Sequence, residues 1–135
     1  MRQAADSSIT IAALVADHEA RELAEGALKG CTRTIAHVAI ETYSVLTRLP
    51  PPRSLVSTDA ATLIEARLPA TYVTLDASAC ATAPRTLAGA RVSGGATYDG
   101  LIALTALEHD LELITRDKRA ERTYRALNVP YQLLH

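Results

Sequence analysis

The chain has 135 residues, a formal net charge of −1, 48% hydrophobic residues and 21% charged residues. This length suits one domain, because domains most often hold about 100–150 residues, and we expect a single domain over residues 1–135. The composition excludes a disordered chain, and no apolar run approaches the ~20 residues that a bilayer requires. Residues 1–15 lack the basic start of a signal peptide, so we expect a cytoplasmic protein.

The first half of the chain alternates between short β-rich runs and helical stripes. In chain order we expect a strand at 1–5, one helix or two in succession at 8–28, a strand at 31–36, a helix at 37–50 and a helix at 55–68. Pro50, Pro51 and Pro52 end the helix at 37–50. Ser57 or Thr58 can cap the helix at 55–68, and Pro69 stops it.

The second half continues the alternation. We expect a strand at 71–75, a short helix and then a loop at Ser93–Gly95 within 77–96, a buried helix at 98–108, a strand at 111–115, a charged, exposed helix at 118–128 and a last strand at 129–134. Pro130 places that last strand at a sheet edge. Strands separated by helices imply an α/β fold, namely a three-layer α/β/α sandwich with a mainly parallel sheet of four or five strands.

Four acidic residues follow strands or begin helices that face strand ends. Asp6 follows the first strand, Glu41 lies in the first turns of helix 37–50, Asp99 lies in the first turn of helix 98–108, and Asp117 comes just after strand 111–115. Ligands of parallel sheets bind outside the carboxyl ends of the strands. We therefore expect the four carboxylates to converge on one edge of the sheet.

Converging carboxylates repel one another, and a divalent cation such as Mg²⁺ resolves that repulsion through oxygen ligands and bound waters. Such a site is suited to clamping a phosphodiester and activating a water. Asp6, Glu41, Asp99 and Asp117 are therefore the candidate metal ligands and catalytic residues of an enzyme that hydrolyses nucleic acid. Ser7 and Thr115 are candidates for holding metal-bound waters, although hydroxyls near helix starts are more often caps.

Each acid also has a structural explanation. Asp6 can cap the first helix, and the helix dipole favours a carboxylate such as Asp99 in a first turn. Asp117 can pair with Lys118 or Arg119, and Glu41 can be a solvated acid on the helix surface. The four histidines show no ligand spacing, which argues against zinc.

Nucleic-acid-binding domains usually have a pI above ~9, and the near-zero net charge of this chain does not fit that pattern. Basic residues nevertheless gather in one stretch. Residues 116–125 carry Arg116, Lys118, Arg119, Arg122 and Arg125. This stretch is either a solvated helix face or a surface that contacts phosphates beside the acids. The first four of these residues are the candidates for the latter role.

Three segments, ADSSITIAAL, AIETYSVLTRLP and YDGLIALTALEHDLELITRDKRAERTYRALNVPY, resemble the acidic motifs of PIN-domain proteins and, more narrowly, of VapC-type toxins of type II toxin–antitoxin pairs. The resemblance runs from Asp6 to the C-terminus. The family's order of acids, Asp, Glu, Asp, Asp, maps onto Asp6, Glu41, Asp99 and Asp117. One departure is the first strand, which is polar and then small where the family usually has a run of Val, Ile or Leu.

The resemblance implies a PIN-like fold and a Mg²⁺- or Mn²⁺-dependent endoribonuclease toxin that cuts structured RNA, such as tRNA or rRNA, and arrests translation and growth. It also implies a homodimer that is neutralised by a cognate VapB-type antitoxin.

Two other functions remain open at this point. A receiver-like signalling domain also gathers acids at strand ends, with Asp76 as the phosphate acceptor and Lys118 as its late lysine, although both fit loosely. A nuclease-like fold that has lost its activity would serve only as a binding module, but it predicts a missing acid, and none is missing.

Overall fold

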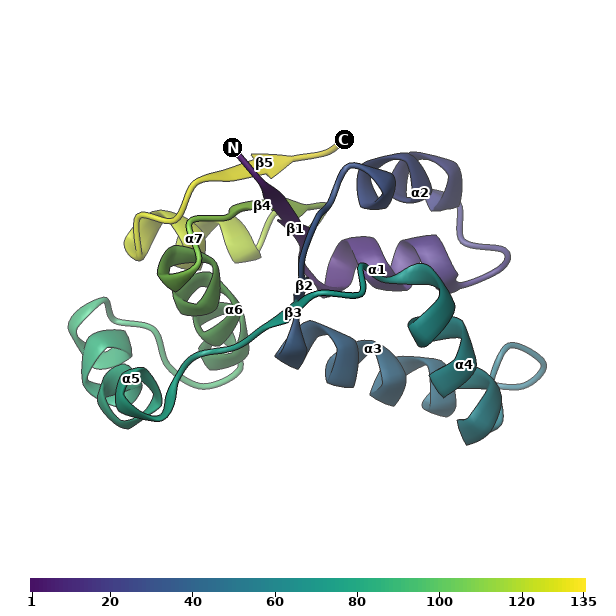
Figure 1. Cartoon of the computed structure of the whole chain (residues 1–135), viewed down its shortest axis with the longest axis horizontal. Helices are drawn as coiled ribbons and strands as arrows, with labels where there is room; N and C mark the ends of the chain where they lie inside the picture. The colour runs from purple at the N-terminus through teal and green to yellow at the C-terminus, as the bar shows by residue number, and fades with distance from the viewer.

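The computed structural model describes all residues from 1 to 135. The chain forms five strands and seven helices (Figure 1). The elements are β1 (Gln3–Ala5), α1 (Ser7–Leu14), α2 (Arg21–Lys29), β2 (Thr34–Ile35), α3 (Ala36–Arg48), α4 (Ser57–Arg67), β3 (Tyr72–Val73), α5 (Ala77–Gly89), α6 (Ala96–Glu108), β4 (Glu112–Thr115), α7 (Ala120–Ala126) and β5 (Tyr131–Leu133). None of these helices combines the length and apolar character that crossing a membrane requires.

All strand pairs are parallel. Strands β1, β4 and β5 form one sheet and β2 and β3 a second. A parallel bridge between Ala4 and Arg33 joins the two sheets, so the strands lie in the order β3-β2-β1-β4-β5. Helices α1–α4 gather on one side of the strands and α5–α7 on the other (Figure 1). The α/β class and the mainly parallel sheet are therefore confirmed, and β5 lies at an edge, as Pro130 predicts.

The small residues of β1 suit its central position. Ala4 and Ala5 are 0% and 4% exposed, and each belongs to a different hydrophobic cluster, so β1 is buried on both faces. The polar start of the strand is satisfied because the Gln3 amide donates to the Glu112 carboxylate at 2.8 Å. Beyond the strand, the Asp6 N–H donates to the Ile114 carbonyl at 3.0 Å, which holds Asp6 in line with the sheet.

Helices α1, α2 and α4 match the sequence predictions except at the start of α4. Residues 8–28 form two helices, α1 and α2, which is one of the two expected arrangements. No side chain caps α4, because Val56 occupies the N-cap position and Ser57 is already helical, so the predicted Ser57 or Thr58 cap is wrong. Its end is as predicted, since Leu68 is extended before Pro69.

The remaining differences concern α5 and α7. Helix α5 is 13 residues long rather than short, although Pro84 removes one backbone donor from its interior. Helix α7 is not a wholly exposed helix, because Ala120, Thr123 and Tyr124 face inward and Tyr124 is 0% exposed. The charged residues of α7 mask this inward stripe, which repeats at helical spacing.

Candidate active site

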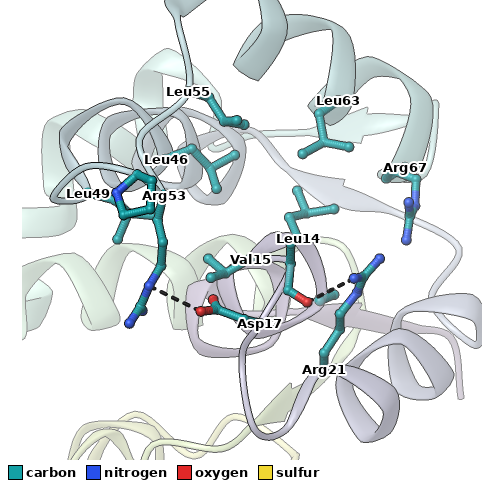
Figure 2. Close-up of a pocket in the computed structure, with 13 residues that line it drawn as sticks. Leu14, Val15, Asp17, Arg21, Leu46, Leu49, Arg53, Leu55, Leu63 and Arg67 are labelled. Carbon is teal, nitrogen blue, oxygen red and sulfur yellow. Dashed lines mark hydrogen bonds and ion pairs between the residues drawn. The ribbon is translucent and has the colours of Figure 1, made fainter.

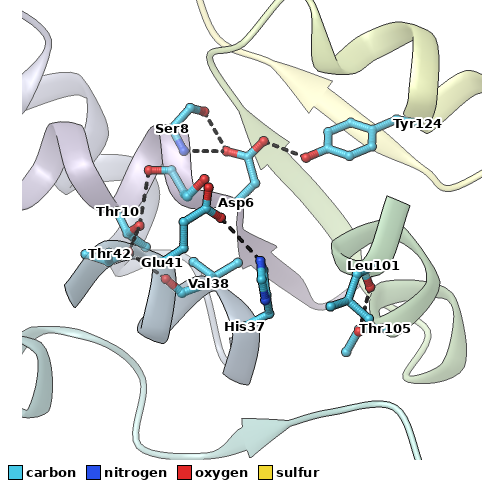
Figure 3. A network of polar contacts seen from close by, with 11 residues as sticks. Asp6, Ser8, Thr10, His37, Val38, Glu41, Thr42, Leu101, Thr105 and Tyr124 are labelled. Atoms are coloured by element: carbon cyan, nitrogen blue, oxygen red, sulfur yellow. Dashed lines mark hydrogen bonds and ion pairs between the residues drawn. The ribbon is translucent and has the colours of Figure 1, made fainter. Parts of the chain in front are cut away.

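Asp6 ends β1 and caps α1, and its carboxylate is fully engaged. Its Oδ1 accepts bonds from the Ser8 N–H at 3.0 Å and from the Ser8 hydroxyl, and its Oδ2 accepts a bond from the Tyr124 hydroxyl at 2.7 Å (Figure 3). The residue is 2% exposed. Burial raises the pKa of Asp6, while the hydrogen bonds from Ser8 and Tyr124 oppose that rise. Asp6 therefore caps α1 and lies at the candidate site at the same time, so the two explanations of this residue do not exclude each other.

Glu41 projects from α3 toward Asp6 (Figure 3). Its Oε1 is buried and has no hydrogen-bond partner. The imidazole nitrogen Nε2 of His37 lies 3.7 Å from this oxygen, which is beyond hydrogen-bond distance. The His37 ring in turn stacks on Tyr98 of α6, with centroids 5.5 Å apart and planes 2° from parallel. A buried carboxylate oxygen without a donor is costly, so this position is suited to a cation or to a water that a cation holds.

Asp99 shows the convergence of the acids most clearly. The pKa of its carboxyl is raised to about 6, first by burial and then by the negative charges of Asp6, Asp117 and Glu41, while Arg119 opposes the rise. Three carboxylates from distant parts of the chain therefore act on one carboxyl at the first turn of α6.

Asp117 lies on the loop after β4 and is held by its own backbone surroundings. Its carboxylate accepts the Arg119 N–H at 2.9 Å, and its own N–H donates to the Thr115 hydroxyl at 3.1 Å. The Thr115 hydroxyl lies 3.3 Å from that of Ser8, which also accepts the Arg116 N–H at 2.8 Å. Ser8 and Thr115 thus tie the loop that carries Asp117 to the strand end that carries Asp6.

The structure brings the four predicted acids to one region but changes some of the supporting residues. The hydroxyl on Asp6 belongs to Ser8 and not to Ser7, whereas Thr115 lies within the network. Sequence reasoning missed Tyr124 and His37, and it preferred Ser7 to Ser8. An acid at a helix start followed two residues later by a serine is a capping pattern that could have indicated Ser8.

The candidate phosphate-contacting residues separate into two groups. Arg116 follows β4 beside Ser8, and its Nε is buried without a hydrogen-bond partner. Lys118 and Arg119 are exposed on the loop beside Asp117. Arg122 lies on α7 and lines a separate cavity.

The donor set fits a hard divalent cation held partly through waters. No three acidic, histidine or cysteine side chains stand close enough together to surround a metal ion directly. Mg²⁺ nevertheless needs only one or two direct carboxylates and keeps several waters. The unpartnered Oε1 of Glu41 and the negative charges that surround Asp99 are the features that such an ion would satisfy.

A second cavity lies away from the acids. It occupies about 370 Å³ between α1, α3 and α4, with an apolar floor that includes Leu14, Leu46 and Leu63 (Figure 2). The arginines at its rim are engaged, since Arg53 pairs with Asp17 at 3.3 Å and Arg67 pairs with Glu25 at 2.8 Å. This cavity contains no group of acids and is not the candidate active site.

Comparison with known proteins agrees with the fold. The sequence profile of the PIN domain matches residues 4–126. The chain therefore belongs to the PIN-domain family, and within it to the VapC ribonucleases. It is 40% identical over 131 residues to Ribonuclease VapC40 of Mycobacterium tuberculosis, covering 97% of this chain and 98% of that protein.

Two further similarities extend the comparison. The chain is 42% identical over 133 residues to Ribonuclease VapC27 of Mycobacterium tuberculosis, covering 93% of this chain and 92% of that protein. A chain in the solved structure of FitAB bound to an IR36 DNA fragment superposes with a TM-score of 0.64 at 19% identity, covering 98% of this chain and 97% of that one. This structural likeness supports the fold alone.

Proposed function

We propose that this chain is a metal-dependent endoribonuclease toxin that hydrolyses phosphodiester bonds of structured RNA, tRNA or rRNA, and so arrests translation and growth. The observation that carries the proposal is the convergence of Asp6, Asp117 and Glu41 on the partly buried Asp99. Burial first, and then the negative charges of these acids, raise the pKa of Asp99 to about 6. Relatives at 40% and 42% identity are named ribonucleases, which supports the same reaction.

Asp6, Glu41, Asp99 and Asp117 are the residues that would hold Mg²⁺ or Mn²⁺ in this proposal. When bound, such an ion supplies charge neutralisation at the phosphoryl oxygens and an activated water. The chain's own contribution is to hold the carboxylates in place before RNA arrives. Ser8 and Tyr124 hold Asp6, and the backbone N–H of Arg119 holds Asp117.

The basic residues beside Asp117 would contact the RNA backbone. Arg116, Lys118 and Arg119 follow β4 directly, at the same sheet edge as the acids. Each phosphate contact adds affinity without reading sequence and makes binding weaker at higher salt. This arrangement combines local positive charge for the RNA with local negative charge for the metal ion, within a chain of net charge −1.

The proposal includes a cognate VapB-type antitoxin and a homodimer. Apolar side chains are exposed on the two helices that carry Glu41 and Asp99. On α3 these are Ile40, at 69% exposed, and Tyr43, and on α6 they are Tyr98 and Leu107. Because α3 and α6 contact each other, these side chains lie on neighbouring helices. We propose that they form an apolar patch that a second copy of this chain covers.

The receiver-like alternative finds no support in the site. Asp76, its phosphate acceptor, is exposed and caps α5 by accepting the Ala79 N–H at 2.7 Å. It follows β3, which lies at the edge of the sheet and not at its centre. The inactive binding module predicts a missing acid, whereas all four acids are present.

Induced expression of the chain in a bacterial host tests this function. The wild type is expected to stop growth, and Asp99→Ala is expected to restore it at equal protein level. Sequencing the 5′ ends of RNA fragments after induction identifies the RNA that is cut. Equal arrest by the wild type and by Asp99→Ala would contradict the proposed site.

A further inference from the structure

A cavity of about 340 Å³ lies between α7 and the turn that joins α5 to α6. Its polar lining contains two arginines and two hydroxyl residues and no acid, namely Arg91, Arg122, Ser93 and Thr123. Neither arginine forms an ion pair, whereas Arg125 on the same helix is paired with Glu121 at 3.1 Å. The cavity therefore carries two uncompensated positive charges.

Thr123 adds a hydroxyl to this lining. The residue lines the cavity and is only 4% exposed. A threonine hydroxyl can donate a hydrogen bond to a ligand with acceptor oxygens. A phosphate group has such oxygens, and arginine forks match them with paired donors.

The cavity is close to the acidic site along two helices. Ala96, which lines the cavity, precedes Asp99 on α6 by three residues, or roughly 4.5 Å of helix rise. Thr123 is adjacent to Tyr124, which donates to Asp6. Ala96 is the first residue of α6, so the cavity lies at the N-terminal end of the helix that carries Asp99.

We propose that this cavity binds a backbone phosphate of the RNA strand beside the bond that is cut, with Arg91 and Arg122 as its cationic donors. The inference rests on the proposed ribonuclease function and adds a phosphate subsite to it. An RNA phosphate is favoured over an acidic protein segment because the cavity shares α6 with Asp99 and α7 with the residue that holds Asp6.

The backbone at Arg91 makes a sharp test possible. Arg91 has φ 60° and follows the end of α5, at a position where glycine is the usual residue. Asp110 and Asn128 occupy the corresponding left-handed positions after α6 and α7. Replacing Arg91 with glycine removes the cation and relieves the backbone at the same time, so folding and binding should respond in opposite directions.

The test measures binding of fluorescein-labelled bulk tRNA by anisotropy, in EDTA to prevent cleavage and over a series of salt concentrations. Arg91→Gly and Arg122→Ala are each expected to weaken binding roughly three- to tenfold. Each is expected to reduce the slope of log affinity against log salt by roughly 0.7 to 0.9. The melting temperature of Arg91→Gly is expected to equal or exceed that of the wild type.

Two control variants separate the cavity from general effects. Asn128→Gly makes the same backbone change at another helix end, and Arg85→Ala removes an exposed arginine of α5 outside the cavity. Both are expected to keep the affinity and salt slope of the wild type. One result would overturn the cavity inference and leave the proposed function intact. In that result, the wild type binds tRNA and cleaves it with Mg²⁺, while Arg91→Gly and Arg122→Ala keep the same affinity and salt slope as Arg85→Ala.

Two other results would also overturn the inference. A wild type that neither binds nor cleaves RNA would remove the proposed function and the subsite with it. In the second, both variants bind tRNA as the wild type does, but a co-expressed cognate antitoxin no longer restores growth in cells that express them. This result would assign the cavity to the protein partner.

Discussion

Asp99 carries a clear electrostatic signal of the converging acids. Its carboxyl has a pKa of about 6 against an ordinary value of 3.8, because it is partly buried and faces three other acids. Binding a proton more tightly in the folded state stabilises the fold fully below the ordinary pKa, and that stabilisation is lost as the pH rises through about 6. A bound cation removes the same repulsion by a different route.

This reasoning predicts how stability depends on pH without metal. In EDTA, the melting temperature of the wild type should rise relative to that of Asp99→Asn as the pH falls from 7.5 to 5. The amide is neutral at every pH, so the variant lacks the effect. Melting curves of both proteins across this range check the prediction, and a constant difference between them would contradict it.

Tyr124 is the second informative residue, because its hydroxyl reaches Asp6 from 118 positions away in the sequence. Tyr124→Phe keeps the ring and removes this bond, and should lower the free energy of unfolding by about 1–2 kcal/mol. Tyr131→Phe, which removes a partly exposed bond to Glu121, is the matched control and should cost less. Urea unfolding measures both, and equal losses would contradict the role given to Tyr124.

The sequence allowed the four acids to be predicted because each follows a strand or begins a helix at the expected edge of the sheet. It did not indicate Tyr124 or His37, because their roles depend on packing between elements. Tyr124 lies within a charged stretch that reads as exposed, and only the packing of α7 against the sheet turns its ring inward.

At the scale of elements, Gly100 shows how packing can override helix propensity. Glycine after Asp99 weakens the first turns of α6 by up to about 1 kcal/mol relative to alanine. In the structure, a Cβ at this position would lie 2.5 Å from Leu87 Cδ2 of α5 and 3.3 Å from Val92 Cγ1. The glycine therefore permits the close approach of α5 to the helix that carries Asp99.

Gly100→Ala should accordingly lower the free energy of unfolding by about 1 kcal/mol, since overpacking costs more than the helix gains. Gly26→Ala is the matched control, because no atom lies within 4 Å of its added Cβ. This control should raise stability by up to about 1 kcal/mol. Chemical unfolding distinguishes the two, and stabilisation of both variants would contradict the packing argument.

The order and type of most elements could be predicted from periodicity, whereas the lengths of the strands could not. The run at 71–75 contains only the two paired residues of β3, and the run at 31–36 contains the two of β2 and the bridged Arg33. Their β-branched residues match the expected type, but pairing extends only as far as the neighbouring strand allows. The extent of α5 was also missed, because Pro84 and a run of small residues obscure its period.

At the scale of the molecule, the acids come from both sides of the sheet. Glu41 belongs to α3 on one side and Asp99 to α6 on the other, while Asp6 and Asp117 follow the adjacent strands β1 and β4. The site is therefore complete only when both sides pack on the central strands. Length and composition alone indicated a small neutral domain and gave no sign of this convergence.

The proposed homodimer gives a further prediction at this scale. Ile40→Glu on α3 should shift the protein from dimer to monomer, because it places a charge on an apolar surface that the second copy would cover. Val56→Glu changes a residue of similar exposure, 64% against 69%, outside that surface and should leave the dimer intact. Light scattering after size-exclusion chromatography reports the mass, and identical masses for both variants would contradict the proposed dimer surface.

The central claim is that four converging carboxylates cut RNA with a divalent cation, and the most direct measurement is cleavage of purified total RNA by the purified chain. Wild-type protein should cut with Mg²⁺ or Mn²⁺ and stop in EDTA, and Asp99→Asn should lose at least a hundredfold in rate, as expected when an electrostatic catalytic group is removed. Cleavage by the wild type that survives EDTA, or cleavage by Asp99→Asn at the wild-type rate, would contradict the account.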